Sequence, residues 1–276
     1  MSQVALVAVV DPDLAAARAA AAPFGVLAFS DYPHVLAEVD AVCIVTPAAS
    51  HYSIARDCLI AGVDVLIEKP AAPTAAQVEQ LAALAESRRR IAQVGHIERF
   101  NPALAALPPA ADLQRLRCVR ATAASGRATD VDVALDLMIH DIDLACWLFR
   151  AEPTGVSASG VIGANGVVDA LRARLEFPGG RRADLLARRE APRAARWLTA
   201  SCPDGRVELD LSPSAGGRDA LTSQLSAFLD AVAERTEPPV GLADGARAVR
   251  IAQALITGAR IRPRLPIALE AISRRR

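Results

Sequence analysis

The feature that most constrains the fold is a regular alternation of short apolar runs and helical segments over the first hundred residues. Four apolar runs rich in Val, Ile, Leu and Ala predict strands at 4–10, 40–46, 63–67 and 91–95. The segments that follow the first three runs predict helices that end near 22 and cover 50–61 and 74–89. Apolar strands separated by helices form a parallel sheet covered on both faces. This part of the chain is therefore predicted to be an α/β, doubly wound parallel sheet.

The pattern changes after about residue 113. A strand at 116–123 and a helix at 133–149 are followed by five strand-like segments with Pro/Gly turn signals between them, at 155–162, 167–177, 181–189, 196–201 and 206–211. Two helices, at 217–235 and 244–260, come last. The second part is predicted to be an α+β domain with a mainly antiparallel sheet. We place the domains at 1–104 and 105–276.

Composition excludes several function classes. The net charge is +0 over 276 residues, and the basic runs at 88–90 and 274–276 suit a helix end and a solvated tail, so nucleic acid is not expected as a partner. No apolar run approaches the ~20 residues that span a membrane, and no secretory signal is visible. Five cysteines, an odd number without a CxxC pair, favour free thiols over a disulfide or a metal site. We expect a cytoplasmic protein without a metal.

Lys69 is the only lysine, against thirty arginines among the 31 basic residues. Arginine stays protonated in proteins, whereas a lysine amine can lose its proton where its surroundings disfavour the charge. A single lysine in this background indicates a position where a guanidinium would not serve. Chance survival of one lysine is the alternative that composition alone leaves open.

Polar residues follow the predicted strands of the parallel sheet, at the edge where such sheets bind ligands. They are Asp11, Thr46-Pro47 with His51 shortly after, Glu68-Lys69-Pro70 and Gly95-His96. Asp11 could accept hydrogen bonds from both ribose hydroxyls of an adenosine, which favours NAD over a 2′-phosphorylated cofactor such as NADP. A helix cap or an ordinary Asp-Pro turn is the alternative for Asp11 alone.

A second polar set lies on the apolar helix predicted at 133–149. Asp136, His140 and Asp143 are spaced by four and three residues, which places them on one face of an α-helix. A histidine satisfied by carboxylate partners and a metal site are the alternatives. Metal is disfavoured because the lysine edge offers no carboxylate ligand beyond Glu68.

Together these motifs resemble the Gfo/Idh/MocA oxidoreductase family over essentially the whole chain. The motifs are Thr46-Pro47 with His51, Glu68-Lys69-Pro70, Gly95-His96-Ile97-Glu98-Arg99-Phe100-Asn101-Pro102, and Asp136 with His140 and Asp143. They are most similar to the sugar-nucleotide branch, the UDP-N-acetylglucosamine 3-dehydrogenases of lipid A precursor pathways. The resemblance implies a Rossmann-type first domain and an NAD-dependent oxidation of a secondary hydroxyl on a sugar.

The resemblance also implies roles for single residues. The catalytic residues would be Lys69, His140 and Asp136. Cofactor contacts would come from Asp11, Thr46, Pro47, His51, Glu68 and Lys69. Substrate contacts would come from Arg99, Asn101, His96 and Asp143, with interdomain structural bonding as the alternative for Arg99 and Asn101. Family members associate through the outer face of the antiparallel sheet, so a homo-oligomer is expected.

The chain departs from the family at its beginning. It enters directly what corresponds to the second strand, and the first strand with its Gly-x-Gly-x-x-Gly loop is not found. We therefore expect a gap in the parallel sheet and weak NAD binding by the chain as printed. A start codon assigned too far downstream and a true truncation both explain this. Two other functions stay open: a dehydrogenase of a free sugar, inositol or other polyol, and a truncated, non-catalytic binding paralogue.

Overall fold

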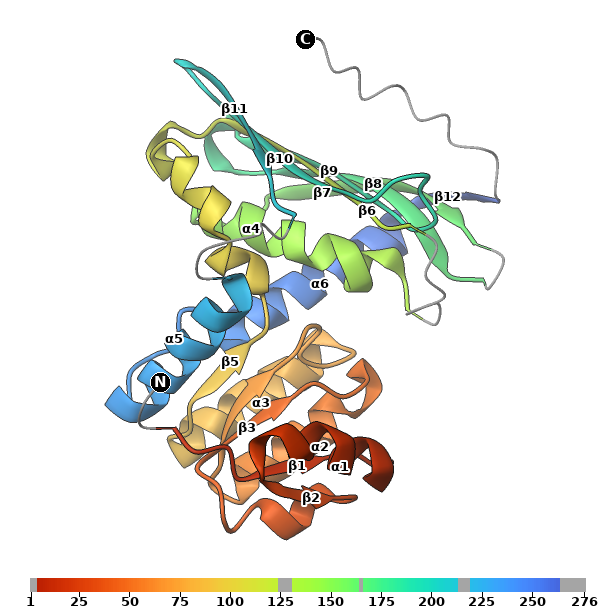
Figure 1. Ribbon diagram of the computed structural model, residues 1–276. Coiled ribbons are helices and arrows are strands. Elements are labelled where there is room, and N and C mark those ends of the chain that lie inside the picture. The colour runs from red at the N-terminus through yellow and green to blue at the C-terminus, as the bar shows by residue number, and fades with distance from the viewer. Residues whose placement is uncertain (1–3, 124–130, 164–165, 213–218, 264–276) are drawn as a thin grey trace. The chain divides into compact units, whose positions relative to one another are not determined.

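The computed structural model describes residues 4–123, 131–163, 166–212 and 219–263. The chain divides into two compact units (Figure 1), each described here by itself: Met1–Phe100 with Gly216–Val249, and Asn101–Ala215 with Arg250–Arg276. The first division lies close to the predicted boundary after residue 104. The second differs from the prediction, because the segment that includes residues 219–249 belongs to the first unit rather than to a continuous C-terminal domain.

The first unit alternates strands and helices as predicted. Its strands are β1 (Ala8–Val10), β2 (Leu27–Phe29), β3 (Ala41–Ile44), β4 (Asp64–Ile67) and β5 (Ala92–Val94). Its helices are α1 (Leu14–Ala21), α2 (Ala48–Ile60), α3 (Ala75–Arg88), α5 (Ala220–Glu234) and the first part of α6 (Leu242–Gly258). Short 3-10 helices are η1 (Ala22–Phe24), η2 (Tyr32–Val35) and η3 (Ile97–Phe100). The strand β2 was not predicted.

All strand pairs of this unit are parallel, but they form two sheets rather than one. Strand β1 pairs with β2, and β3, β4 and β5 pair in that order. Every residue of β4 and β5 is buried, whereas Cys43 of β3 is exposed and β1 is only half-buried. Among the described strands, β1 and β3 each have one neighbour.

Side chains set the beginnings of two helices in this unit. Asp13 caps α1 by accepting hydrogen bonds from the backbone N–H groups of Ala15 and Ala16. Thr74 caps α3 by accepting from the N–H of Gln77 at 3.3 Å, which confirms the N-terminus predicted there. Arg89 ends α3 in the left-handed conformation, so part of the basic run at 88–90 is the end of a helix.

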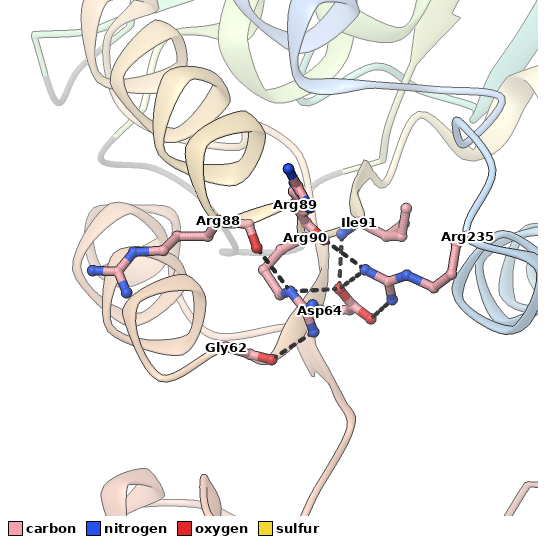
Figure 2. A network of polar contacts seen from close by, with 7 residues as sticks. All are labelled: Gly62, Asp64, Arg88, Arg89, Arg90, Ile91 and Arg235. Carbon is pink, nitrogen blue, oxygen red and sulfur yellow. Dashed lines mark hydrogen bonds and ion pairs between the residues drawn. The ribbon is translucent and has the colours of Figure 1, made fainter.

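A buried carboxylate joins α5 to the parallel sheet (Figure 2). Asp64, at the amino end of β4, accepts a hydrogen bond from the N–H of Ile91 at 2.7 Å and ion-pairs with Arg235, which follows α5, at 2.5 Å. Arg235 also donates to the carbonyl of Arg89 at 2.7 Å, and Arg90 lies 3.9 Å from the carboxylate. These contacts, together with the packing of α5 on η3, explain why a late segment of the chain belongs to the first unit.

The second unit contains one seven-stranded sheet, in the order β11-β10-β6-β9-β8-β7-β12. The strands are β6 (Arg115–Ala121), β7 (Gly155–Ile162), β8 (Val168–Glu176), β9 (Arg182–Arg188), β10 (Ala195–Cys202), β11 (Gly205–Asp210) and β12 (Arg260–Pro263). Four strand pairs are antiparallel, and β6–β9 and β7–β12 are parallel. The predicted mainly antiparallel sheet is confirmed. The last predicted helix is wrong at its end, because α6 stops at Gly258 and β12 follows.

The helices of this unit include a π-helix that the sequence did not predict. The predicted helix at 133–149 is a π-helix, η6 (Ala134–Met138), continued by α4 (Ile139–Phe149), which lies along one face of the sheet (Figure 1). The remaining short helices are η4 (Pro102–Ala106), η5 (Ala110–Asp112) and η7 (Pro178–Gly180). Leu116 and Cys118 of β6 are buried, while Arg115 and Arg117, which alternate with them along the strand, are exposed. The sheet therefore has one packed and one open face.

We predict that Asp64→Asn destabilises the protein by about 2 kcal/mol, because it leaves Arg235 without its buried counter-charge. Urea unfolding measures the change. Asp31→Asn is the matched control, since Asp31 is exposed and its side chain makes no capping hydrogen bond; a change below about 0.5 kcal/mol is expected there. Equal effects of the two substitutions would show that the Asp64 contacts do not hold the unit together.

Candidate active site

The parallel register brings three polar segments to one edge of the β3–β4–β5 sheet. The N–H of Glu68 donates to the carbonyl of Ile44 at 2.9 Å, and the N–H of Gly95 donates to the carbonyl of Ile67 at 2.7 Å. Thr46-Pro47, Glu68-Lys69-Pro70 and Gly95-His96 therefore follow the carboxyl ends of adjacent strands. This is the edge at which sheets of this kind bind ligands.

The side chain of Glu68 lies against Gly95. A Cβ atom at position 95 would come within 2.9 Å of both Cδ and Oε1 of Glu68, so only glycine leaves room for this carboxylate. Oε2 of Glu68 accepts a hydrogen bond from the backbone N–H of Lys69 at 3.2 Å. The peptide bond between Lys69 and Pro70 is cis. Glu68 thus contacts the backbone of the turn that carries the lysine.

His51 lies in α2 and is 1% exposed. Its Nδ1 is 2.8 Å from the carbonyl oxygen of Pro70, and its Nε2 is 2.6 Å from that of Thr46. Both ring nitrogens of this predicted cofactor residue are therefore within hydrogen-bond distance of backbone carbonyls.

Asp11 directly follows β1 and is exposed. Its Oδ1 accepts a hydrogen bond from the N–H of Asp13 at 2.8 Å, and its backbone N–H donates to the carbonyl of Phe29 at 3.2 Å. The turn is thus fixed, with an accessible carboxylate at a strand end. A carboxylate in this position suits the ribose hydroxyls of NAD.

Arg99 and Asp244 form an ion pair within the first unit. The Arg99 guanidinium lies 3.0 Å from the Asp244 carboxylate and also donates to the carbonyl of Pro239. Burial raises the pKa of the Asp244 carboxyl, but the hydrogen bond and charge of Arg99, together with Arg247, outweigh this effect and hold the pKa below its usual range. The Arg99 side chain is 5% exposed. Arg99 therefore makes structural bonds, but its partners Asp244 and Pro239 belong to the same unit rather than to another domain.

Asn101 also makes structural hydrogen bonds. Its Oδ1 accepts from the N–H of Ala103 at 3.1 Å, which caps η4, and its Nδ2 donates to the carbonyl of Leu211 at 3.0 Å. A substrate contact would compete with these bonds. His96, the other substrate candidate of this segment, is 1% exposed and belongs to the first unit.

The catalytic candidates of the second unit lie on η6 and α4. Asp136 is in the π-helix, which has more residues per turn than an α-helix. The prediction that Asp136, His140 and Asp143 share one face assumed α-helical geometry throughout, and this geometry begins only at Ile139. π-helical turns are frequent at functional sites. His140 is 9% and Asp143 1% exposed, so both are part of the helix's packed surface.

Arg189 ion-pairs with Asp136 and Asp169, at 3.2 Å and 3.1 Å. It also donates to the carbonyl of Val131, just before η6. Because its side chain is only 8% exposed, these contacts fix the position of the Asp136 carboxylate. No pattern in the sequence distinguishes Arg189, which directly follows β9, from the many other arginines near strand ends.

A second buried ion pair lies beside His140. Arg120 of β6 lies 2.8 Å from the carboxylate of Asp141, and both side chains are 3% exposed. The signal in the sequence is an arginine at a position of β6 that alternation assigns to the buried face, with Leu116 and Cys118. The pair joins α4 to the sheet next to the candidate catalytic histidine.

Among 4–123, 131–163, 166–212 and 219–263, no group of three or more His, Cys, Asp or Glu side chains is placed to hold a metal ion. No helix in these same ranges is long and apolar enough to cross a membrane.

Known proteins match both parts of the chain. Residues 1–96 match the family model described as "Oxidoreductase family, NAD-binding Rossmann fold", and residues 119–208 match that of the GFO/IDH/MocA C-terminal domain. The chain belongs to the Gfo/Idh/MocA oxidoreductase family. It is therefore an NAD-dependent oxidoreductase, and the Rossmann-type sheet and the antiparallel sheet are the two parts of this family's fold.

Two relatives in this family are named for different substrates, a sugar nucleotide and an inositol. The UDP-N-acetylglucosamine 3-dehydrogenase of Acidithiobacillus ferrooxidans is 33% identical over 254 residues, covering 83% of this chain and 81% of the relative. A solved structure of that enzyme matches with a TM-score of 0.86 at 31% identity, over 92% of this chain and 89% of the other. The scyllo-inositol 2-dehydrogenase (NAD(+)) of Bacillus subtilis is 30% identical over 206 residues, covering 68% of this chain and 60% of the relative.

Proposed function

We propose that this protein oxidises a secondary hydroxyl of a sugar nucleotide, with UDP-N-acetylglucosamine as the candidate substrate and NAD as oxidant. The observation that carries the proposal is the match to the enzyme of A. ferrooxidans, which extends through both units at 33% identity. None of the five cysteines forms a disulfide, which suits the reducing cytoplasm as the location of the protein.

A polyol dehydrogenase is the second candidate. It is supported by relatives of similar identity that are named for inositol, such as the scyllo-inositol enzyme and an inositol 2-dehydrogenase of Saccharopolyspora erythraea, 34% identical over 168 residues. These matches cover 68% and 57% of this chain, against 83% for the sugar-nucleotide enzyme. The more extended match favours the nucleotide sugar.

The proposed chemistry assigns a role to each polar group. NAD, when bound at the edge that carries Asp11 and Glu68, would supply the acceptor for the hydride of the alcohol carbon. The Lys69 amine hydrogen-bonds the hydroxyl oxygen, and His140 acts as the acid or base that exchanges its proton. Asp136, held by Arg189, orients the imidazole or accepts a hydrogen bond from a neighbouring sugar hydroxyl. Asp11 binds the ribose hydroxyls, Thr46, Pro47 and Glu68 line the cofactor, and His96 and Asp143 serve the substrate.

We predict that the purified protein, supplied with excess NAD because weak cofactor binding is expected, reduces NAD when given UDP-N-acetylglucosamine. We expect myo-inositol and free N-acetylglucosamine to give at least about tenfold lower kcat/KM. The nucleotide supplies binding groups that the free sugar lacks, and this binding energy can be used in the transition state. NADH absorbance measures the reaction. A preference for inositol would replace the proposed substrate by the polyol, and an absence of turnover with every nucleotide sugar would reject the proposal.

We predict that Lys69→Arg lowers kcat by at least about a hundredfold, because a planar guanidinium differs in shape from the amine that hydrogen-bonds the hydroxyl oxygen and cannot lose a proton at neutral pH. Arg90→Lys is the matched control, since it exchanges the same two residue types at the opposite end of the sheet. Circular dichroism and NAD titration show whether the variants keep the fold and the cofactor. Activity of Lys69→Arg near that of the wild type would contradict the role of the amine.

We also propose that the open face of the antiparallel sheet joins copies of this chain. On this face, Trp197, Val119 and Leu186 are neighbours across β10, β6 and β9, and all three are partly exposed. The next row contains Asp184, which ion-pairs with Arg115 and Arg174. An apolar row beside charges of both signs is complementary to itself, as a two-fold interface requires.

We predict that Val119→Glu converts an oligomer to a monomer in sedimentation velocity, because it places a charge at the centre of the apolar row. Val156→Glu is the control, since Val156 pairs with the buried-face residue Leu175 and is 40% exposed, so it lies on the opposite face of the same sheet. A wild-type monomer, or an oligomer unaffected by Val119→Glu, would show that this face is not the interface.

A further inference from the structure

His51 is a buried titratable side chain to which the proposed chemistry gives no role in proton transfer. Its ring lies between two segments of the ligand-binding edge, the end of β3 at Thr46 and the turn after β4 at Pro70. The distances from its two nitrogens to the carbonyl oxygens of these residues are 2.6 Å and 2.8 Å. Both are typical of hydrogen bonds.

The chemistry of the partners determines what the ring must offer. A backbone carbonyl oxygen accepts hydrogen bonds and cannot donate them, so each of the two contacts needs an N–H of the imidazole. A neutral imidazole has a single N–H, and its other nitrogen presents a lone pair. In the neutral form, that lone pair would face a carbonyl oxygen within 3 Å. Only the doubly protonated ring donates to both carbonyls.

We propose that His51 is a positioning residue that, as an imidazolium, ties the turn carrying Lys69 to the end of β3. The turn is then held on both sides of the lysine. Glu68 accepts the hydrogen bond of the Lys69 N–H, and His51 donates to the carbonyl of Pro70. The link to catalysis rests on the proposed function, whereas the two hydrogen bonds do not.

This role differs from direct contact with the cofactor. A ring that is 1% exposed and donates through both nitrogens has no polar atom left for NAD. His51 would therefore act on the cofactor edge through the backbone of Thr46 and Pro70. Its removal should loosen the turn rather than delete a ligand contact.

The ring protonation can be measured directly, because the chain has four histidines. In a protein labelled with 15N-histidine, long-range 1H–15N correlation spectra at neutral pH should show one ring with both nitrogens protonated. That ring should be absent from the spectrum of His51→Gln and present in that of His34→Gln, which changes an exposed histidine. A His51 ring with one unprotonated nitrogen would overturn the proposal.

The positioning effect has its own readout. In His51→Gln, which can donate to at most one of the two carbonyls, amide hydrogen exchange in residues 68–72 should be about tenfold faster or more. Tyr52→Phe, a change at the next residue of α2, should leave it unchanged. In the active enzyme, kcat should fall more than KM rises. Unchanged exchange would overturn the positioning role whether or not the protein oxidises a nucleotide sugar, so the two proposals fail separately.

Discussion

The structure of the first unit depends on the burial of β4 and on the carboxylate at its amino end. Burying Asp64 would be costly without partners, and the chain supplies them from segments far apart in the sequence: the N–H of Ile91 and the guanidinium of Arg235. This requirement fixes where α5 can pack. Because β4 is held at its amino end and paired on both sides, its carboxyl end delivers Glu68, Lys69 and Pro70 to a defined place.

At that carboxyl end, side chains hold the turn through contacts with its backbone. Glu68 passes over Gly95 and accepts the N–H of Lys69, and His51 contacts the carbonyl of Pro70. These contacts place the backbone of the turn, whereas the Lys69 amine is the group to which the proposed chemistry is assigned. The second unit uses the same division, since Arg189 and Arg120 hold Asp136 and Asp141 while His140 carries the titratable ring. In both units, charged side chains fix the backbone or a carboxylate beside a candidate proton carrier.

The alternation of apolar runs was sufficient to predict four of the five strands of the first unit and six of the seven in the second. Strand β2 was missed, and β12 was missed because the last helix was extended to residue 260, where β12 begins. Candidate site residues that follow strands were found because a strand end is a local signal. His51 was found too, but not its two carbonyl partners, which come from different turns. The roles of Arg189 and Asp64 could not be predicted, because these residues act through contacts with residues distant in sequence.

The membership of α5 in the first unit illustrates why such contacts limit prediction from sequence. A boundary drawn where the pattern of strands changes assumes that each domain is one continuous segment. Here the ion pair between Asp64 and Arg235, together with the packing of α5 on η3, joins α5 to a unit that lies far from it in the sequence. Contacts between distant segments also bear on the use of arginine, which carries nearly every positive charge in this chain. Its fixed fork of donors makes it suited to such distant contacts, which leaves the single lysine for the position where a proton can move.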